Sequence, residues 1–80
     1  MDQHYLKTWP DYFQAVWDGK KTFEVRVNDR DFKAGDILVL EEWNPDFEMY
    51  TGSALAKRVT YIIGEPFAKE GTVIMALGDY

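Results

Sequence analysis

The sequence contains no cysteine and only one histidine, His4. Without cysteine, disulfide bonds, thiol catalysis and zinc sites with thiolate ligands are excluded. A single imidazole also argues against the multi-histidine sites that usually hold transition metals. No apolar run approaches the length of a membrane span, and the first ten residues, MDQHYLKTWP, lack the apolar segment of a signal peptide. We therefore expect a cytoplasmic protein with no membrane segment, no metal site and no cofactor.

Positive charge is also scarce, because 9 Lys and Arg residues face 14 Asp and Glu residues, for a net charge of −5. Non-specific binding to a phosphate backbone needs a surplus of Lys and Arg. Any nucleic-acid role must therefore come from a local basic patch or from a pocket for one nucleotide. The charges are uneven along the chain: the basic residues gather in one segment (Lys20, Lys21, Arg26, Arg30, Lys33) and acidic residues in the next (Glu41, Glu42, Asp46, Glu48).

The length of 80 residues predicts a single domain over residues 1–80. A chain of this size buries only about 60–65% of the surface that its unfolded form exposes, so its core must be compact. The aromatic content of 16% helps such a core to close, because each aromatic ring buries a large area.

One amphipathic helix is predicted early in the chain, from residue 9 or 10 to residue 18. Its apolar stripe has helical spacing (Trp9, Phe13, Val16, Trp17). Thr8 is the expected capping residue, and Pro10 is tolerated in the first turn. Gly19 suits the left-handed position that ends many helices.

Strands are predicted for the rest of the chain, with an extended segment at residues 4–8. In residues 22–27 the apolar Phe23, Val25 and Val27 alternate with polar residues, which indicates one apolar face and one solvated polar face. Further strands are expected at 37–43, 54–63 and 72–80, with Tyr61 in the core. Residues 44–53, NPDFEMYTGS, form the longest irregular stretch and are expected to be a mobile loop.

This element order predicts a protein that is mainly β with one or two helices, in the α+β class. Strands that follow one another directly favour antiparallel pairing. A small β-barrel plugged by the N-terminal helix would bury the aromatic stripe of that helix.

The segment GKKTFEVR, residues 19–26, places Lys21, Glu24 and Arg26 close together. On spacing alone they fit a solvated strand face, where exposed ion pairs contribute only about 0–1 kcal/mol. The alternative is a polar pocket in which two cationic donors flank one acceptor. Such a pocket suits a planar ligand with a carbonyl beside an amine, such as a nucleobase edge. Lys21 has the opposite parity to Glu24, but the exit from the helix can redirect its long side chain.

The same segment matches the G-x-K-x-x-E-x-R signature of ASCH domains, a branch of the PUA-like superfamily of small β-barrels linked to RNA. The chain resembles a short group of uncharacterised ASCH-like proteins over most of its length (Pro10 to Val16, Gly19 to Asp36, Tyr50 to Gly52, Val59 to Ile62, Val73 to Leu77). The resemblance implies a PUA-like barrel plugged by an N-terminal helix. It also implies a cleft between the two that binds RNA or a nucleotide-like small molecule. The implied binding residues are Lys21, Thr22, Glu24, Arg26 and Arg30.

An enzyme is the alternative that the resemblance leaves open. One group of ASCH relatives deacetylates acetylated cytidine with the signature lysine, a threonine three residues later and a distant glutamate. Lys21 matches the lysine, but Glu24 stands at the threonine position, and a carboxylate cannot replace the hydroxyl nucleophile without changing the chemistry. Lys21 and Glu24 are the candidate catalytic residues for such an amidohydrolase or for a nuclease. A protein-interaction module is the third possibility, with the acidic segment Glu41 to Glu48 as its contact surface.

Other residues have both a structural and a functional interpretation. Residues 28–31, NDRD, fit a turn whose side chains bond the local backbone, or the rim of the cleft. The helical spacing favours core packing for at least one of Trp9 and Trp17, although either ring could stack on a base. In residues 44–53, which are expected to be mobile, the aromatic rings are better stacking candidates. Ser53 stands where relatives of this short type often have a basic residue, which weakens any phosphate contact from that loop.

Overall fold

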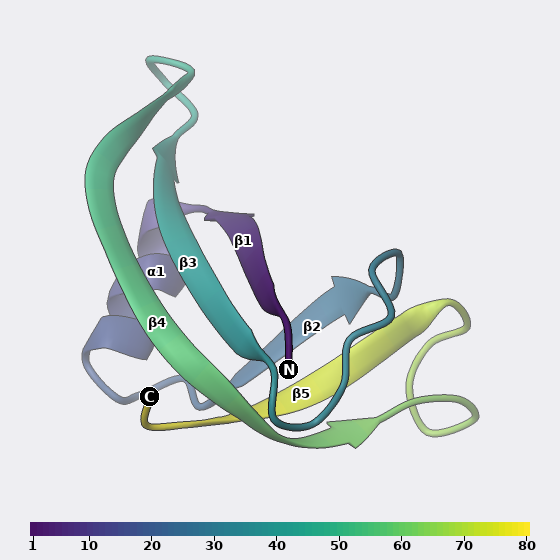
Figure 1. Ribbon diagram of the computed structural model, residues 1–80. Coiled ribbons are helices and arrows are strands. Elements are labelled where there is room, and N and C mark those ends of the chain that lie inside the picture. Colours follow the sequence, from purple (N-terminus) through teal and green to yellow (C-terminus); the bar gives the residue numbers. More distant parts are fainter.

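Five strands form one curled sheet in the order β1-β3-β4-β5-β2 in the computed structural model, which describes residues 1–80 (Figure 1). The strands are β1 (Gln3–Thr8), β2 (Phe23–Val27), β3 (Ile37–Asn44), β4 (Met49–Ile63) and β5 (Thr72–Gly78). The helix α1 (Pro10–Trp17) connects β1 to β2. The predicted class, mainly β with a helix near the N-terminus, is confirmed, and the sheet curls into a half-barrel.

The strand pairing leaves β1 and β2 as the two edges of the sheet. β3 pairs with β4 and β4 with β5, both antiparallel, as predicted for strands that follow one another directly, and β5 also pairs antiparallel with β2, which lies far from it in the chain. β1 pairs with β3 in parallel, because α1 and β2 intervene and return the chain to the same end of the sheet. Figure 1 shows β1 beside β3, with β2 beyond it on the far side of the opening.

Helix α1 covers Pro10–Trp17, whereas the prediction ran from residue 9 or 10 to residue 18, and its N-cap residue also differs from the predicted one. Trp9 is the N-cap residue and no side chain caps the helix, so the expected capping by Thr8 is wrong. The Thr8 hydroxyl donates instead to the Leu6 carbonyl. Gly19 has φ of 77°, which confirms the left-handed exit. With eight residues, α1 is too short to cross a lipid bilayer.

The core lies on the inner face of the curled sheet, where α1 contributes Phe13 and Val16 (the other members are Leu6, Phe32, Leu38, Leu40, Val59, Val73 and Met75). Trp9 and Trp17 are more than half exposed, so the predicted preference for the core is wrong for both rings. Tyr61 is also exposed on the outer face of β4, which contradicts its predicted core position.

Strand β2 begins one residue later than predicted, and the face that it buries is the opposite of the predicted one. Glu24 is only 3% exposed, whereas Val25 and Val27 are 53% and 64% exposed. The prediction of a solvated polar face is therefore wrong, because a buried carboxylate is tolerated when cations neutralise it. The polar side of β2 lines the interior, and its apolar side faces solvent.

Strands β3 and β4 continue through most of the segment predicted to be a mobile loop. Only residues 45–48 form a turn, at the tip of the two-stranded arm at the top of Figure 1. The Asn44 side-chain carbonyl accepts the N–H groups of Asp46 and Phe47, which closes the turn locally. Glu48 takes φ of 52° there. We call residues 41–55 of this hairpin the arm.

Candidate functional site

A cleft of about 730 Å³ lies where the end of β1, one side of α1 and the start of β2 meet. The chain enters β2 through a tight exit from α1, in which the N–H groups of Lys20 and Lys21 both donate to the Ala15 carbonyl. This exit turns Lys21 toward the side of β2 that carries Glu24, as the sequence argument allowed. The segment that matches the ASCH signature therefore forms one wall of the cleft.

Glu24 is the centre of the charge arrangement in this wall. Its Oε1 accepts from Lys21 Nζ at 2.5 Å, and its Oε2 accepts from Arg26 Nε at 2.9 Å. The Glu24 side chain is almost fully buried, while those of Lys21 and Arg26 are mostly buried. Each carboxylate oxygen thus has its own cation, which offsets the cost of removing the charge from water.

Arginine side chains span the opening between the two edge strands. Arg26 donates from Nη1 to the Lys7 carbonyl at 3.2 Å and from Nη2 to the Thr8 hydroxyl at 3.3 Å. Arg30 donates from Nη1 to the Tyr5 carbonyl at 2.7 Å. These bonds satisfy carbonyls on the free edge of β1; those of Arg26 hold β2 at a fixed distance from β1, and that of Arg30 holds the turn after β2.

The lining of the cleft is positively charged although the whole chain is negative. Lys7, Lys20, Lys21 and Arg26 line it together with one carboxylate, that of Glu24. Their formal sum is +3, in a chain whose net charge is −5. Glu24 is neutralised by its two partners, whereas Lys20 is exposed and makes no ion pair. The cleft is therefore a local basic patch, as the sequence composition requires of any nucleic-acid site.

Aromatic rings border the same cleft. Trp9 and Tyr12 line it and are each more than half exposed, so their ring faces are available for stacking. Lys21 Nζ lies 5.9 Å from the Tyr12 ring centroid and 5.1 Å from the Phe23 ring centroid. Flat apolar groups and cationic donors thus occupy one concave surface.

The structure brings together only some of the predicted binding residues. Lys21, Glu24 and Arg26 line the cleft, but Thr22 does not, and its carbonyl accepts from the Leu77 N–H. Arg30 lies in a neighbouring hollow of about 340 Å³, which shares Arg26 with the cleft. In the 28–31 turn, the Asn28 side chain accepts the Phe32 N–H, which confirms the self-bonding interpretation.

Sequence reasoning missed Lys7, Tyr12 and Lys20 as lining residues. Lys20 adjoins the signature, and Tyr12 follows Trp9 by three residues, which places both rings on one side of the helix. These two signals are present in the sequence. Lys7 carries no such signal, because only the parallel pairing of β1 with β3 places it beside the cleft.

Lys21 and Glu24, the candidate catalytic residues of the enzyme alternative, are bonded to each other. Lys21 Nζ donates to Glu24 and also to the Phe23 carbonyl at 2.7 Å. The Glu24 carboxylate accepts on both oxygens. Lys21 is therefore engaged with Glu24 and the backbone, and Glu24 with Lys21 and Arg26, so both side chains are held in place.

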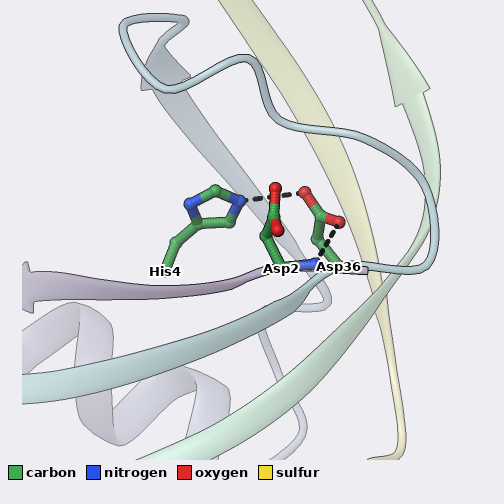
Figure 2. A group of neighbouring side chains, drawn as sticks. All are labelled: Asp2, His4 and Asp36. Carbon is green, nitrogen blue, oxygen red and sulfur yellow. Dashed lines mark hydrogen bonds and ion pairs between the residues drawn. The ribbon is translucent and has the colours of Figure 1, made fainter.

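A second polar cluster, Asp2, His4 and Asp36, lies at the opposite end of β1 (Figure 2). Their possible ligand atoms lie within 4.8 Å of one another, a grouping that no sequence spacing indicated. The Asp36 carboxylate accepts from His4 Nε2 at 2.9 Å and from the N–H groups of Asp2 and Lys33, both at 3.0 Å. Since both Asp36 oxygens are occupied, we interpret the cluster as a clip that fastens β1 to the turn before β3.

The hydrogen bonds of this clip also set the charge of Asp36. Burial by itself would raise the pKa of the Asp36 carboxyl, but the Asp2 N–H, the His4 ring and the Lys33 N–H together outweigh it. The pKa of Asp36 is therefore lowered from its ordinary value of 3.8.

Comparisons with known proteins give two matches. The family model described as "Domain of unknown function (DUF3850)" matches residues 3–77. A protein of Escherichia phage P2, described as "Uncharacterized 12.9 kDa protein in GpA 3'region", is 39% identical over 57 residues. That alignment covers 71% of this chain and 50% of the phage protein, so the chain spans about half the length of the curated relative it matches.

Proposed function

The chain belongs to the DUF3850 family, and from this premise we propose that its cleft between α1 and β2 binds RNA or a nucleotide-like small molecule. The observation that carries the proposal is the concentration of cations around the cleft in an acidic chain. A formal charge of +3 on the lining attracts phosphate, while the net charge of −5 repels it elsewhere. Binding is thus confined to one pocket.

The chemistry of the lining supports a ligand with both an anionic group and a flat ring. Lys20 is free to meet a phosphate, and Arg26 keeps guanidinium N–H groups beyond those it donates to Glu24, Lys7 and Thr8. Trp9 and Tyr12 offer ring faces at the border of the cleft, where a base can stack. A nucleotide combines these two features in one molecule.

The fold assignment within this proposal is a PUA-like barrel of the ASCH type, with α1 as its plug. Burial of Phe13 and Val16 in the core supports this role for the helix. The position of Lys21, Glu24 and Arg26 beside the helix supports the assignment of the G-x-K-x-x-E-x-R signature to a ligand cleft.

A charge-removal pair of variants tests the proposal. Lys21 is a poor choice because its loss would leave Glu24 with one cation fewer, whereas Lys20 is exposed and bonds to no other side chain. We expect Lys20→Ala to weaken binding of labelled single-stranded RNA roughly three- to tenfold. Fluorescence anisotropy at low salt measures this affinity.

Lys69→Ala is the matched control, because Lys69 is an exposed lysine in the connection between β4 and β5 and does not line the cleft. It removes the same charge from the molecule. Equal losses of affinity in the two variants would show that binding follows net charge alone, and would overturn the cleft assignment.

The enzyme alternative is tested with the same protein. Incubation with acetylated cytidine should leave the substrate intact, because Lys21 and Glu24 hold each other in place. If the wild type released cytidine and Glu24→Gln did not, the protein would be an amidohydrolase and the binding proposal would be wrong.

A further inference from the structure

The outer side of β2 continues into an apolar surface that crosses three strands. We call this surface the outer apolar face; it consists of Phe23, Val25 and Val27 on β2, Ile74 on β5, and Tyr61 and Ile63 on β4. In the strand register Val25 is opposite Ile74, which is opposite Ile63. Ala76 on β5 is likewise opposite Phe23 on β2 and Tyr61 on β4. Because cross-strand neighbours share a face, these side chains form one continuous patch.

The patch is exposed and carries no charged side chain. Five of its six members are exposed, and only Ile74 is partly covered. The opposite faces of the same strands are occupied by the buried Glu24, Val73 and Met75. Isolated apolar side chains are normal on a protein surface, but a contiguous patch across a sheet marks an interaction site.

We propose that a second copy of this chain covers the outer apolar face, in a symmetric dimer with the two sheets packed face to face. Two such sheets pack about 10 Å apart, and a two-fold axis pairs the same residues on both copies. An uncharged apolar surface can pack against an identical surface on a second copy, whereas it offers no ion pairs to a charged partner.

The area of the patch fits this partner. Five exposed side chains of this size present on the order of 500 Å² of apolar surface. A stable interface of ordinary size buries roughly 800 Å² on each partner, of which a little over half is apolar. The outer apolar face therefore supplies the apolar part of one such interface, and polar residues around it supply the rim.

Oligomeric state measured against concentration tests the dimer. In sedimentation equilibrium, we expect the wild-type chain to pass from monomer to dimer as its concentration rises. Val27→Lys and Tyr61→Lys, at residues of the face that do not line the cleft, should each raise the dimer dissociation constant at least about tenfold, because each buries a charge in the interface. Both sites are more than half exposed, so circular dichroism should show an unchanged fold.

Phe47→Lys is the control, since Phe47 is 74% exposed at the tip of the arm and lies outside the patch. It should dimerise like the wild type. Added salt should strengthen dimerisation, because it screens repulsion between two chains of charge −5. RNA binding in the cleft should weaken with salt instead, so the two properties can fail independently.

Three results would overturn the dimer. The wild type could stay monomeric up to near-millimolar concentration, Val27→Lys could dimerise as tightly as the wild type, or Phe47→Lys could be as defective as Val27→Lys. Binding of the monomer to neutral phosphatidylcholine vesicles, lost in Val27→Lys, would assign the face to a lipid surface instead.

Discussion

At the scale of single residues, Glu24 determines how the candidate site is built. Its carboxylate is buried, and its two oxygens are bound by Lys21 and Arg26. Arg26 also reaches Lys7 and Thr8 of the other edge strand. One acidic residue therefore fixes two cations of the cleft and, through Arg26, the spacing of β1 and β2.

We expect Glu24→Gln to lower the free energy of unfolding by about 2–4 kcal/mol, because it leaves two mostly buried cations facing an uncharged amide whose NH₂ group is a third donor. Urea denaturation at pH 7 measures the change. The control is Asp79→Asn, since Asp79 is fully exposed in its ion pair with Lys57 and should matter little. Equal unfolding midpoints for Glu24→Gln and the wild type would contradict the structural role of Glu24.

The Asp36 clip predicts a pH dependence with a definite sign. The pKa of Asp36 is lower in the folded chain than its ordinary value of 3.8, so the ionised form stabilises the fold. This contribution is present in full above about pH 5 and is lost as the pH falls below 3.8 through the lowered pKa.

Asp36→Asn should therefore be less stable than the wild type at pH 7, by roughly 1–3 kcal/mol, and the difference should shrink below pH 3.8. Unfolding free energies of both chains across this range give the test. The exposed Asp46→Asn serves for comparison and should follow the wild-type profile. A difference between Asp36→Asn and the wild type that does not change with pH would refute the linkage.

At the scale of elements, the sequence predicts positions better than orientations. The period-2 pattern locates β2 correctly, but Phe23, Val25 and Val27 face solvent because the paired Glu24 takes the interior. Alternation shows that two faces differ, and it does not show which one is buried. Residues 44–53 of the arm are predicted to be a mobile loop, and this stretch begins with Asn-Pro-Asp and ends with Thr-Gly-Ser, which are typical turn residues. Here the first forms a tight turn, and Gly52, at φ of 95°, lies within a continuous strand.

The arm is a two-stranded ribbon, so its order depends on a few side-chain contacts. Trp43 packs edge-on against Tyr50, with ring centroids 5.0 Å apart, and Lys7 Nζ lies 4.0 Å from the Trp43 ring centroid. We expect Trp43→Ala to speed hydrogen exchange of the arm amides at least about tenfold, while amides of Leu38 and Leu40 keep their protection.

Amide exchange followed by NMR provides the measurement, with Phe47→Ala as the control, because Phe47 is exposed at the tip. Faster exchange throughout the core strands would show that Trp43 supports the whole sheet. Unchanged exchange in the arm would show that its order comes from backbone pairing alone.

At the scale of the whole molecule, the cleft exists only because β1, α1 and β2 converge. The sequence placed Lys21, Glu24 and Arg26 together through a motif, and that grouping agrees with the structure. It could not place Lys7, whose position depends on the parallel pairing of β1 with β3. It placed Thr22 at the site although that residue lies outside the cleft lining. Local patterns thus predicted one wall of the cleft, and the long-range pairing supplied the others.

The most direct test of the central claim, that the cleft binds RNA or a nucleotide, is an amide NMR titration at low salt with short single-stranded RNA and cytidine nucleotides. We expect shifts on residues 19–26 and along α1, reduced by Lys20→Ala and by added salt, with the arm and the β4 and β5 residues of the outer apolar face unaffected. No shifts at millimolar ligand, or shifts only outside the cleft, would contradict the claim.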